Sequence, residues 1–140
     1  MSAALWAPSH ERIEGANLSR FMRFVHERFG AELPDYAALY DYSNAHPDRF
    51  WTALWEFCGI RAGGDLEPAF EHFEAMPGCR FFPRAQLNFA QNLLRFRDDR
   101  LAIIARGEDG STREIRYAEL AEQVRRMRAA LHAAGVGPGD

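Results

Sequence analysis

The sequence predicts an α+β chain in which a helical region is followed by a β-hairpin and one long helix. Helical spacing of apolar residues and helix-capping residues dominate the chain up to about Arg95. After Arg97 the pattern changes to two short runs of strand length with a turn cluster between them. Helical periodicity then returns over Ala118–Ala134. With 47% hydrophobic residues, the 140-residue chain can build the core of one domain or of part of one.

Polar side chains that can cap a helix predict the first and third helices. Ser9 can cap a short helix that runs to Gly15, and Asp35 can cap another around Tyr36–Tyr42. A hydroxyl or carboxylate at such a position accepts a hydrogen bond from an amide of the first turn that has no partner within the helix. We therefore expect both helices to begin directly after these residues.

Apolar stripes define the second and fourth predicted helices. The second follows an Asn17 or Ser19 cap and ends at Gly30. Its apolar face comprises Phe21, Met22, Val25 and Phe29. The fourth opens at Pro47, which suits a first helical turn, and ends at Gly59. Its wide apolar surface predicts a core centred on Phe50, Trp51, Leu54, Trp55 and Phe57.

The stretch Met76–Leu94, MPGCRFFPRAQLNFAQNLL, is the most informative part of the chain. Its Pro and Gly residues predict a turn-rich connector, and a helix is expected after Pro83. Two apolar anchors lie in the connector: Phe81 and Phe82. Two amide side chains share a face of the expected helix and can bond the backbone beside them: Asn88 and Asn92. The segment before it, Arg61–Ala75, has weak periodicity, and we expect a loop there.

The last part of the chain predicts a hairpin and a helix. Leu101–Ala105 and Thr112–Tyr117 are runs of strand length, and Glu108–Ser111 is the turn between them. The helix Ala118–Ala134 ends at Gly135. It carries an apolar stripe of Leu120, Val124, Met127 and Leu131. Three arginines near its middle are expected to face solvent: Arg125, Arg126 and Arg128.

Composition narrows the classes of function. A formal net charge of −3 argues against a nucleic-acid or anionic-membrane partner. All 17 basic residues are Arg, so no step that needs a Lys can take place on this chain. Cys58 and Cys79 have no metal-ligand spacing, and their apolar neighbours predict buried, reduced thiols in a cytoplasmic protein. Neither a signal peptide nor a membrane span is expected.

Candidate catalytic groups are scattered, and we assign no catalytic, cofactor-binding or metal-binding residue. The glycines of Gly135–Gly139 follow a helix instead of a strand, so they predict a turn and not a phosphate loop. None of the five histidines pairs with another His or Cys at ligand spacing: His10, His26, His46, His72 and His132. Ser43 or Ser111 with His46 and Asp48 is a set that any chain of this size offers. The aromatic stripes of the fourth helix are more often core than a ligand box.

The same stretches carry a family resemblance. Met76–Leu94 resembles the segment MPG-x-x-[WF]-F-P-x-x-x-L-N-[YF]-A-x-N-L-L near the start of acetoacetyl-CoA synthetases, which are AMP-forming acyl-CoA ligases of the adenylate-forming superfamily. Leu5–Phe24 is similar to the opening of that family, and Phe50–Gly59 to its FW-x-x-[LV]-WEF-x-G element. Tyr117–Asp140 resembles the helix and turn that open the large domain across the superfamily.

The resemblance implies two half-reactions in a longer parent protein. Acetoacetate and MgATP give acetoacetyl-AMP and pyrophosphate, and CoA then displaces AMP. In the superfamily the phosphate loop, the ribose-binding acid and the catalytic Lys all lie beyond the part that this chain matches. The resemblance therefore implies that ATP, Mg²⁺ and CoA bind only in the parent. The 140-residue chain alone would be structural and inactive. The parent protein would act in ketone-body use and lipid metabolism.

The implied organisation has two parts. Residues 1–95 would be a helical N-terminal extension of the acetyl-CoA synthetase type. Residues 96–140 would begin the AMP-binding domain, whose remainder would be their packing partner. Two alternatives stay open. The first is an acetyl- or propionyl-CoA synthetase, in which the corresponding segment typically reads LN-x-x-x-N-C-L-D-R-H. This chain has LNFAQNLLRF, without the Cys-Leu-Asp-Arg-His ending, which favours the acetoacetyl branch. A stand-alone, non-catalytic interaction module would be indicated by a stop codon directly after Asp140.

Overall fold

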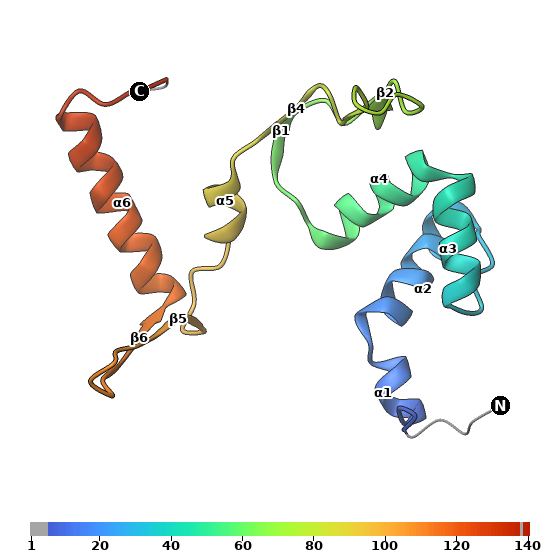
Figure 1. Ribbon diagram of the computed structural model, residues 1–140, viewed down its shortest axis with the longest axis horizontal. Helices are drawn as coiled ribbons and strands as arrows, with labels where there is room; N and C mark the ends of the chain where they lie inside the picture. Colours follow the sequence, from blue (N-terminus) through green and yellow to red (C-terminus); the bar gives the residue numbers. More distant parts are fainter. Residues whose placement is uncertain (1–5, 138) are drawn as a thin grey trace. The chain divides into compact units, whose positions relative to one another are not determined.

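The computed structural model describes residues 6–137 and 139–140 of the chain, which divides into two compact units (Figure 1). The units are Met1–Leu87 and Asn88–Asp140. Both contain helices and antiparallel strand pairs, so the expected α+β class is confirmed. The boundary between the units, at Leu87 and Asn88, lies earlier in the chain than the expected change from helical region to hairpin near Arg95–Arg100. Assignment of residues 1–95 and 96–140 to domains of a larger protein stays a prediction.

Four helices open the first unit. Of the three side-chain caps that the sequence predicts, two are present. Their bounds are α1 His10–Glu14, α2 Asn17–Phe29, α3 Tyr36–Ala45 and α4 Pro47–Cys58. Ser9 accepts from the amide of Arg12 and Asp35 from that of Ala38, as expected. The N-cap of α2 is Ala16, which has no side chain to bond an amide, so the Asn17 or Ser19 cap was wrong.

The core of the first unit lies where α2, α3 and α4 meet. Its buried residues are Phe21, Val25, Leu39 and Ala53. Among the expected core residues, Phe50, Leu54 and Phe57 pack against this cluster. Trp55 is buried with 8% of its surface exposed, whereas Trp51 is 39% exposed, so full burial of Trp51 was wrong. Cys58 is also exposed and Cys79 half-buried, which corrects the expectation of two buried thiols.

Residues 62–87 form two nested strand pairs where we expected a loop, a turn-rich connector and the start of a helix. The outer pair joins β1 Ala62–Gly64 to β4 Ala85–Leu87, and the inner pair joins β2 Phe70–Glu71 to β3 Arg80–Phe81. These strands hold two or three residues each, too few for an alternating pattern to be visible in the sequence. The expected helix after Pro83 therefore starts only with α5, Phe89–Leu93.

The two predicted anchors of the connector are confirmed within the first unit. The Phe81 ring lies 5.6 Å from that of Trp51, and the Phe82 ring 4.6 Å from that of Trp55. Phe82 has a φ of 44°, a left-handed conformation that costs a residue with a Cβ roughly 1–2 kcal/mol. Its amide donates to the carbonyl of Ala69 at 2.7 Å. Ring packing and this hydrogen bond offset the conformational cost and hold the strand pairs against α4.

The second unit contains α5, the predicted hairpin and the predicted long helix. Its hairpin pairs β5 Leu101–Arg106 with β6 Thr112–Arg116, and α6 Tyr117–Ala133 follows directly. Asp109 accepts from the amide of Ser111 at 2.9 Å and so closes the turn. Both elements are confirmed within a residue or two of their expected ends.

Asn88 and Asn92 bond the backbone as expected. The side-chain oxygen of Asn88 accepts from the amide of Gln91 and so caps α5, while Nδ2 of Asn92 donates to the carbonyl of Asn88. The two residues do not share a face of the helix as expected, because Asn88 precedes the helix as its N-cap instead of lying within it. Both amides therefore fix the start of this short helix.

A compact cluster joins the base of the hairpin to the start of α6. Arg100 donates three hydrogen bonds to the carboxylate of Asp98, and its guanidinium lies 4.0 Å from the ring centre of Phe96. The Phe96 ring in turn lies 6.0 Å from that of Tyr117. The side-chain hydrogen bond from Arg100 holds the pKa of Asp98 below its usual range. This exposed pair fixes local geometry more than it adds stability.

Candidate functional site

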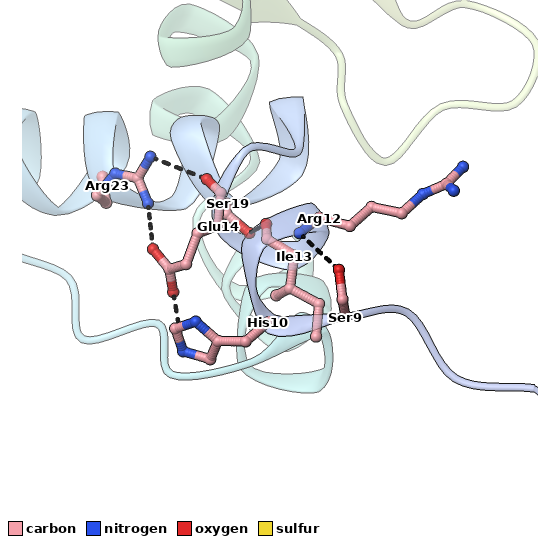
Figure 2. A network of polar contacts seen from close by, with 7 residues as sticks. All are labelled: Ser9, His10, Arg12, Ile13, Glu14, Ser19 and Arg23. Atoms are coloured by element: carbon pink, nitrogen blue, oxygen red, sulfur yellow. Dashed lines mark hydrogen bonds and ion pairs between the residues drawn. The ribbon is translucent and has the colours of Figure 1, made fainter.

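A hollow of about 450 Å³ is lined by α1, α2 and the residues that follow α2, and it holds four charged side chains: Glu14, Arg23, Glu27 and Glu32. Figure 2 shows its polar network, in which Arg23 of α2 reaches back to the end of α1. Arg23 donates to the carboxylate of Glu14 and to the Glu14 carbonyl, both at 3.4 Å. The Ser19 hydroxyl donates to the carbonyl of Ile13 at 2.6 Å. The Ile13 carbonyl also accepts from the amide of Ala16 at 3.1 Å, so the Ser19 bond is an additional one at the end of α1.

Two histidines lie near carboxylates here: His26 lines the hollow, and His10 lies on α1 beside Glu14. Nε2 of His10 is 3.9 Å from Glu14. Nδ1 of His26 is 3.1 Å from the carbonyl oxygen of Ala31 and 3.6 Å from Glu32. More than half of the side-chain surface of each of these ionisable groups is exposed, so solvent screens the pairs. The arrangement docks α1 on α2, and no general base here is held against a nucleophile.

The most unusual polar atom in the first unit is the Tyr42 hydroxyl. It is buried and has no partner within hydrogen-bond geometry among the described residues. Burial raises the pKa of Tyr42, and the nearby Arg49 lowers it in part. A hollow of about 550 Å³ that Tyr42, His46 and Arg49 line lies beside α3. With its pKa raised above 10, Tyr42 is neutral at physiological pH, so its buried hydroxyl is not a nucleophile.

The hydroxyl, histidine and carboxylate set considered in the sequence does not form a triad. The Ser43 hydroxyl donates to the carbonyl of Tyr40 at 2.7 Å and is thus used within α3. His46 links α3 to α4 and its ring lies 5.1 Å from that of Tyr42. Ser111 belongs to the hairpin turn of the other unit. Over residues 6–137 and 139–140, no three His, Cys, Asp or Glu side chains gather as a metal site requires.

The aromatic residues of α4 serve packing, as expected. Phe21 of α2 lies edge-on to Phe50 at 5.6 Å and to Phe57 at 5.2 Å. Trp51 and Trp55 pack against the connector. Each ring thus has an aromatic partner from within its own unit.

Three successive amides of the glycine-rich segment after α6 have partners within the chain: those of Gly135, Val136 and Gly137. The amide of Gly137 donates to the carboxylate of Asp140 at 2.7 Å. Pro138 lies outside the described residues. This geometry agrees with the expected turn.

An apolar groove of about 630 Å³ lies along α6. It is lined by Val124, Met127, Leu131 and Val136, and no described residue of its unit buries these side chains.

The arginines near the middle of α6 form ion pairs on their own helix. Glu122 accepts a forked pair of hydrogen bonds from Arg125 and another from Arg126. These bonds lower the pKa of Glu122 to about 2. The expected solvent-facing arginines are thus partly engaged in ion pairs on their own helix.

Sequence reasoning missed the α1–α2 network and the buried Tyr42 hydroxyl. Glu14 and Arg23 belong to different helices, and only the angle between those helices brings the two side chains together. No spacing rule within a single helix signals such a pair. The one available signal was the short Gly15-Ala16 link, which forces α1 and α2 to lie close.

None of the helices over the described residues combines the length and the apolar character needed to cross a membrane.

No family model matches the chain. Individual proteins do match it. Acetoacetyl-coenzyme A synthetase of Rhizobium meliloti is 41% identical over 136 residues, which cover 97% of this chain and 21% of that protein. Malonamoyl-CoA synthetase of Penicillium aethiopicum is 31% identical over 143 residues, which cover 97% of this chain and 20% of that protein.

A solved structure matches the fold as well. Acetoacetyl-CoA synthetase from Streptomyces lividans superposes with a TM-score of 0.88 at 35% identity, covering 99% of this chain and 22% of that one. Sequence identity and shared fold extend over both compact units. The chain is therefore homologous to acetoacetyl-CoA synthetases over nearly its whole length, and it spans about a fifth of the length of these relatives.

Proposed function

We propose that this chain forms the N-terminal part of an AMP-forming acetoacetate–CoA ligase and has a structural role there. The observation that carries the proposal is the match to acetoacetyl-CoA synthetases over 97–99% of the chain, in sequence and in fold. The described side chains agree with a structural role. The charged network of α1 and α2 docks one helix on the other, and the aromatic residues of α4 hold the connector.

The parent protein would carry out both half-reactions, with ATP, Mg²⁺ and CoA bound by residues outside this chain. Forming an acyl-adenylate brings a carboxylate to the α-phosphate of ATP, and this approach of two anions needs cationic and amide groups around the phosphates. In the superfamily that this chain resembles, the phosphate loop and the catalytic Lys lie beyond the matched part, and the chain itself contains no Lys. We therefore place no step of the reaction on residues 1–140.

The names of the relatives suggest a substrate class for the parent. One is an acetoacetyl-CoA and another a malonamoyl-CoA synthetase. Both acyl groups are short and carry a carbonyl group on the third carbon. We propose that the parent activates a short carboxylate with such a carbonyl, acetoacetate foremost. Acetate, propionate and butyrate lack the group, so the acetyl- and propionyl-CoA synthetase alternative predicts a different order of substrates.

The packing partner of this chain would be the remainder of its own adenylation domain. The apolar groove of α6 is the surface that supports this proposal, because soluble proteins seldom leave such a helix face open to water. The parent would bind a small-molecule carboxylate, and neither a nucleic acid nor a membrane. We place the parent protein in the cytoplasm, where ATP and CoA are supplied.

Steady-state kinetics of the protein encoded by the complete reading frame tests the substrate. We would compare kcat/KM for acetoacetate, malonamate, acetate, propionate and butyrate, with ATP, Mg²⁺ and CoA present. Butyrate is the matched control, because it has the same chain length as acetoacetate without the carbonyl. We expect a preference for acetoacetate over butyrate beyond the roughly 10–200-fold that one methylene gives. Equal or better use of acetate would move the parent to the alternative family.

ATP–pyrophosphate exchange by the isolated 140-residue chain tests the structural role separately. We expect no exchange above the protein-free rate with any of the five carboxylates. Carboxylate-dependent exchange would overturn the structural role and leave the substrate proposal intact. A stop codon after Asp140 in the gene would instead favour the stand-alone interaction module.

A further inference from the structure

We draw no further inference here: the strongest candidate, the apolar groove along α6 that Val124, Met127, Leu131 and Val136 line, is an unpartnered helix face whose covering by the rest of a longer chain is already part of the proposed function, and nothing in the described residues shows any other occupant.

Discussion

Trp51 and Trp55 lie about one helical turn apart on α4, and their surroundings differ. Trp55 is 8% exposed and packs on Phe82, whereas Trp51 is 39% exposed and packs on the exposed Phe81. We expect Trp55→Ala to lower the free energy of unfolding of the chain by about 3–5 kcal/mol, since it removes a buried ring and leaves a cavity. Trp51→Ala should cost clearly less, because much of its ring already contacts water. Urea unfolding curves of both variants measure the difference.

Trp55→Phe is the control for this comparison. It keeps an aromatic ring against Phe82, so it should recover a large part of the loss. Equal losses for the two Ala variants would contradict the burial described here.

Glu122 is the residue whose ionisation the structure perturbs most clearly. Hydrogen bonds from Arg125 and then from Arg126 lower its pKa from 4.5 to about 2. A lowered pKa in the folded state means that the carboxylate contributes to stability above pH 4.5. That contribution is lost as the pH falls from 4.5 through about 2. We expect an NMR titration of the Glu122 carboxyl carbon to have its midpoint near the lower value.

The double variant Arg125→Gln, Arg126→Gln separates the cause of this shift from the position of Glu122 on α6. It replaces both guanidinium groups with neutral amides on shorter side chains and keeps a similar helix propensity, and a neutral amide stabilises a carboxylate less than a charged donor does. Its titration midpoint should move back toward 4.5. An unperturbed midpoint in the unmodified chain would mean that the forked pair is not populated in solution.

At the scale of elements, the nested strand pairs depend on one close backbone approach. Gly64 in β1 has a φ of 80°, and a Cβ at this position would overlap the carbonyl oxygen of Arg84. Ala at this position meets both conformational strain and a collision with backbone that cannot swing aside. We expect Gly64→Ala to destabilise the first unit by more than the roughly 1–2 kcal/mol of left-handed strain alone.

Gly30 offers a matched control. It ends α2 with a φ of 71°, and nothing lies within 4 Å of the place where its Cβ would be. Gly30→Ala should therefore cost only the strain. The two variants are compared by the midpoint and slope of thermal unfolding. If they lose the same stability, the β1–β4 pair is not formed as described.

The elements that sequence reasoning predicted are those whose signals are local. Ser9 and Asp35 bond amides within their own first turns, and the hairpin and α6 carry long periodic patterns. The pairs β1–β4 and β2–β3 were missed because their partners are far apart in the chain and each strand is too short to show a pattern. Tertiary contacts decide such elements, and a single sequence does not display those contacts.

The candidate site divides in the same way. The absence of a local metal or phosphate-loop pattern was visible in the sequence. The Glu14–Arg23 contact and the buried hydroxyl of Tyr42 were not, because both follow from how helices pack. Phe82 is a third case, since its left-handed backbone runs against its own preference and occurs together with the ring contact to Trp55 and the hydrogen bond to Ala69.

At the scale of the whole chain, the buried residues are distributed unevenly between the two units. Every buried apolar residue among those described belongs to the first unit: Phe21, Val25, Leu39, Ala53, Trp55 and Ala69. In the second unit, α6 has no buried residue and the hairpin has only two strands. A two-stranded hairpin is marginally stable in water, and a helix without a buried face gains little from packing.

Hydrogen exchange of the isolated chain should therefore separate the units. We expect slow exchange of amides in α2 and α4, and exchange faster by at least an order of magnitude in β5, β6 and α6, because local opening there exposes little additional apolar surface. Mass spectrometry of peptic peptides resolves these segments, and the full-length protein is the comparison. If the α6 face is covered in the parent, its amides should become as slow as those of α4 there. Equal protection of both units in the monomeric 140-residue chain would contradict the difference in burial described here.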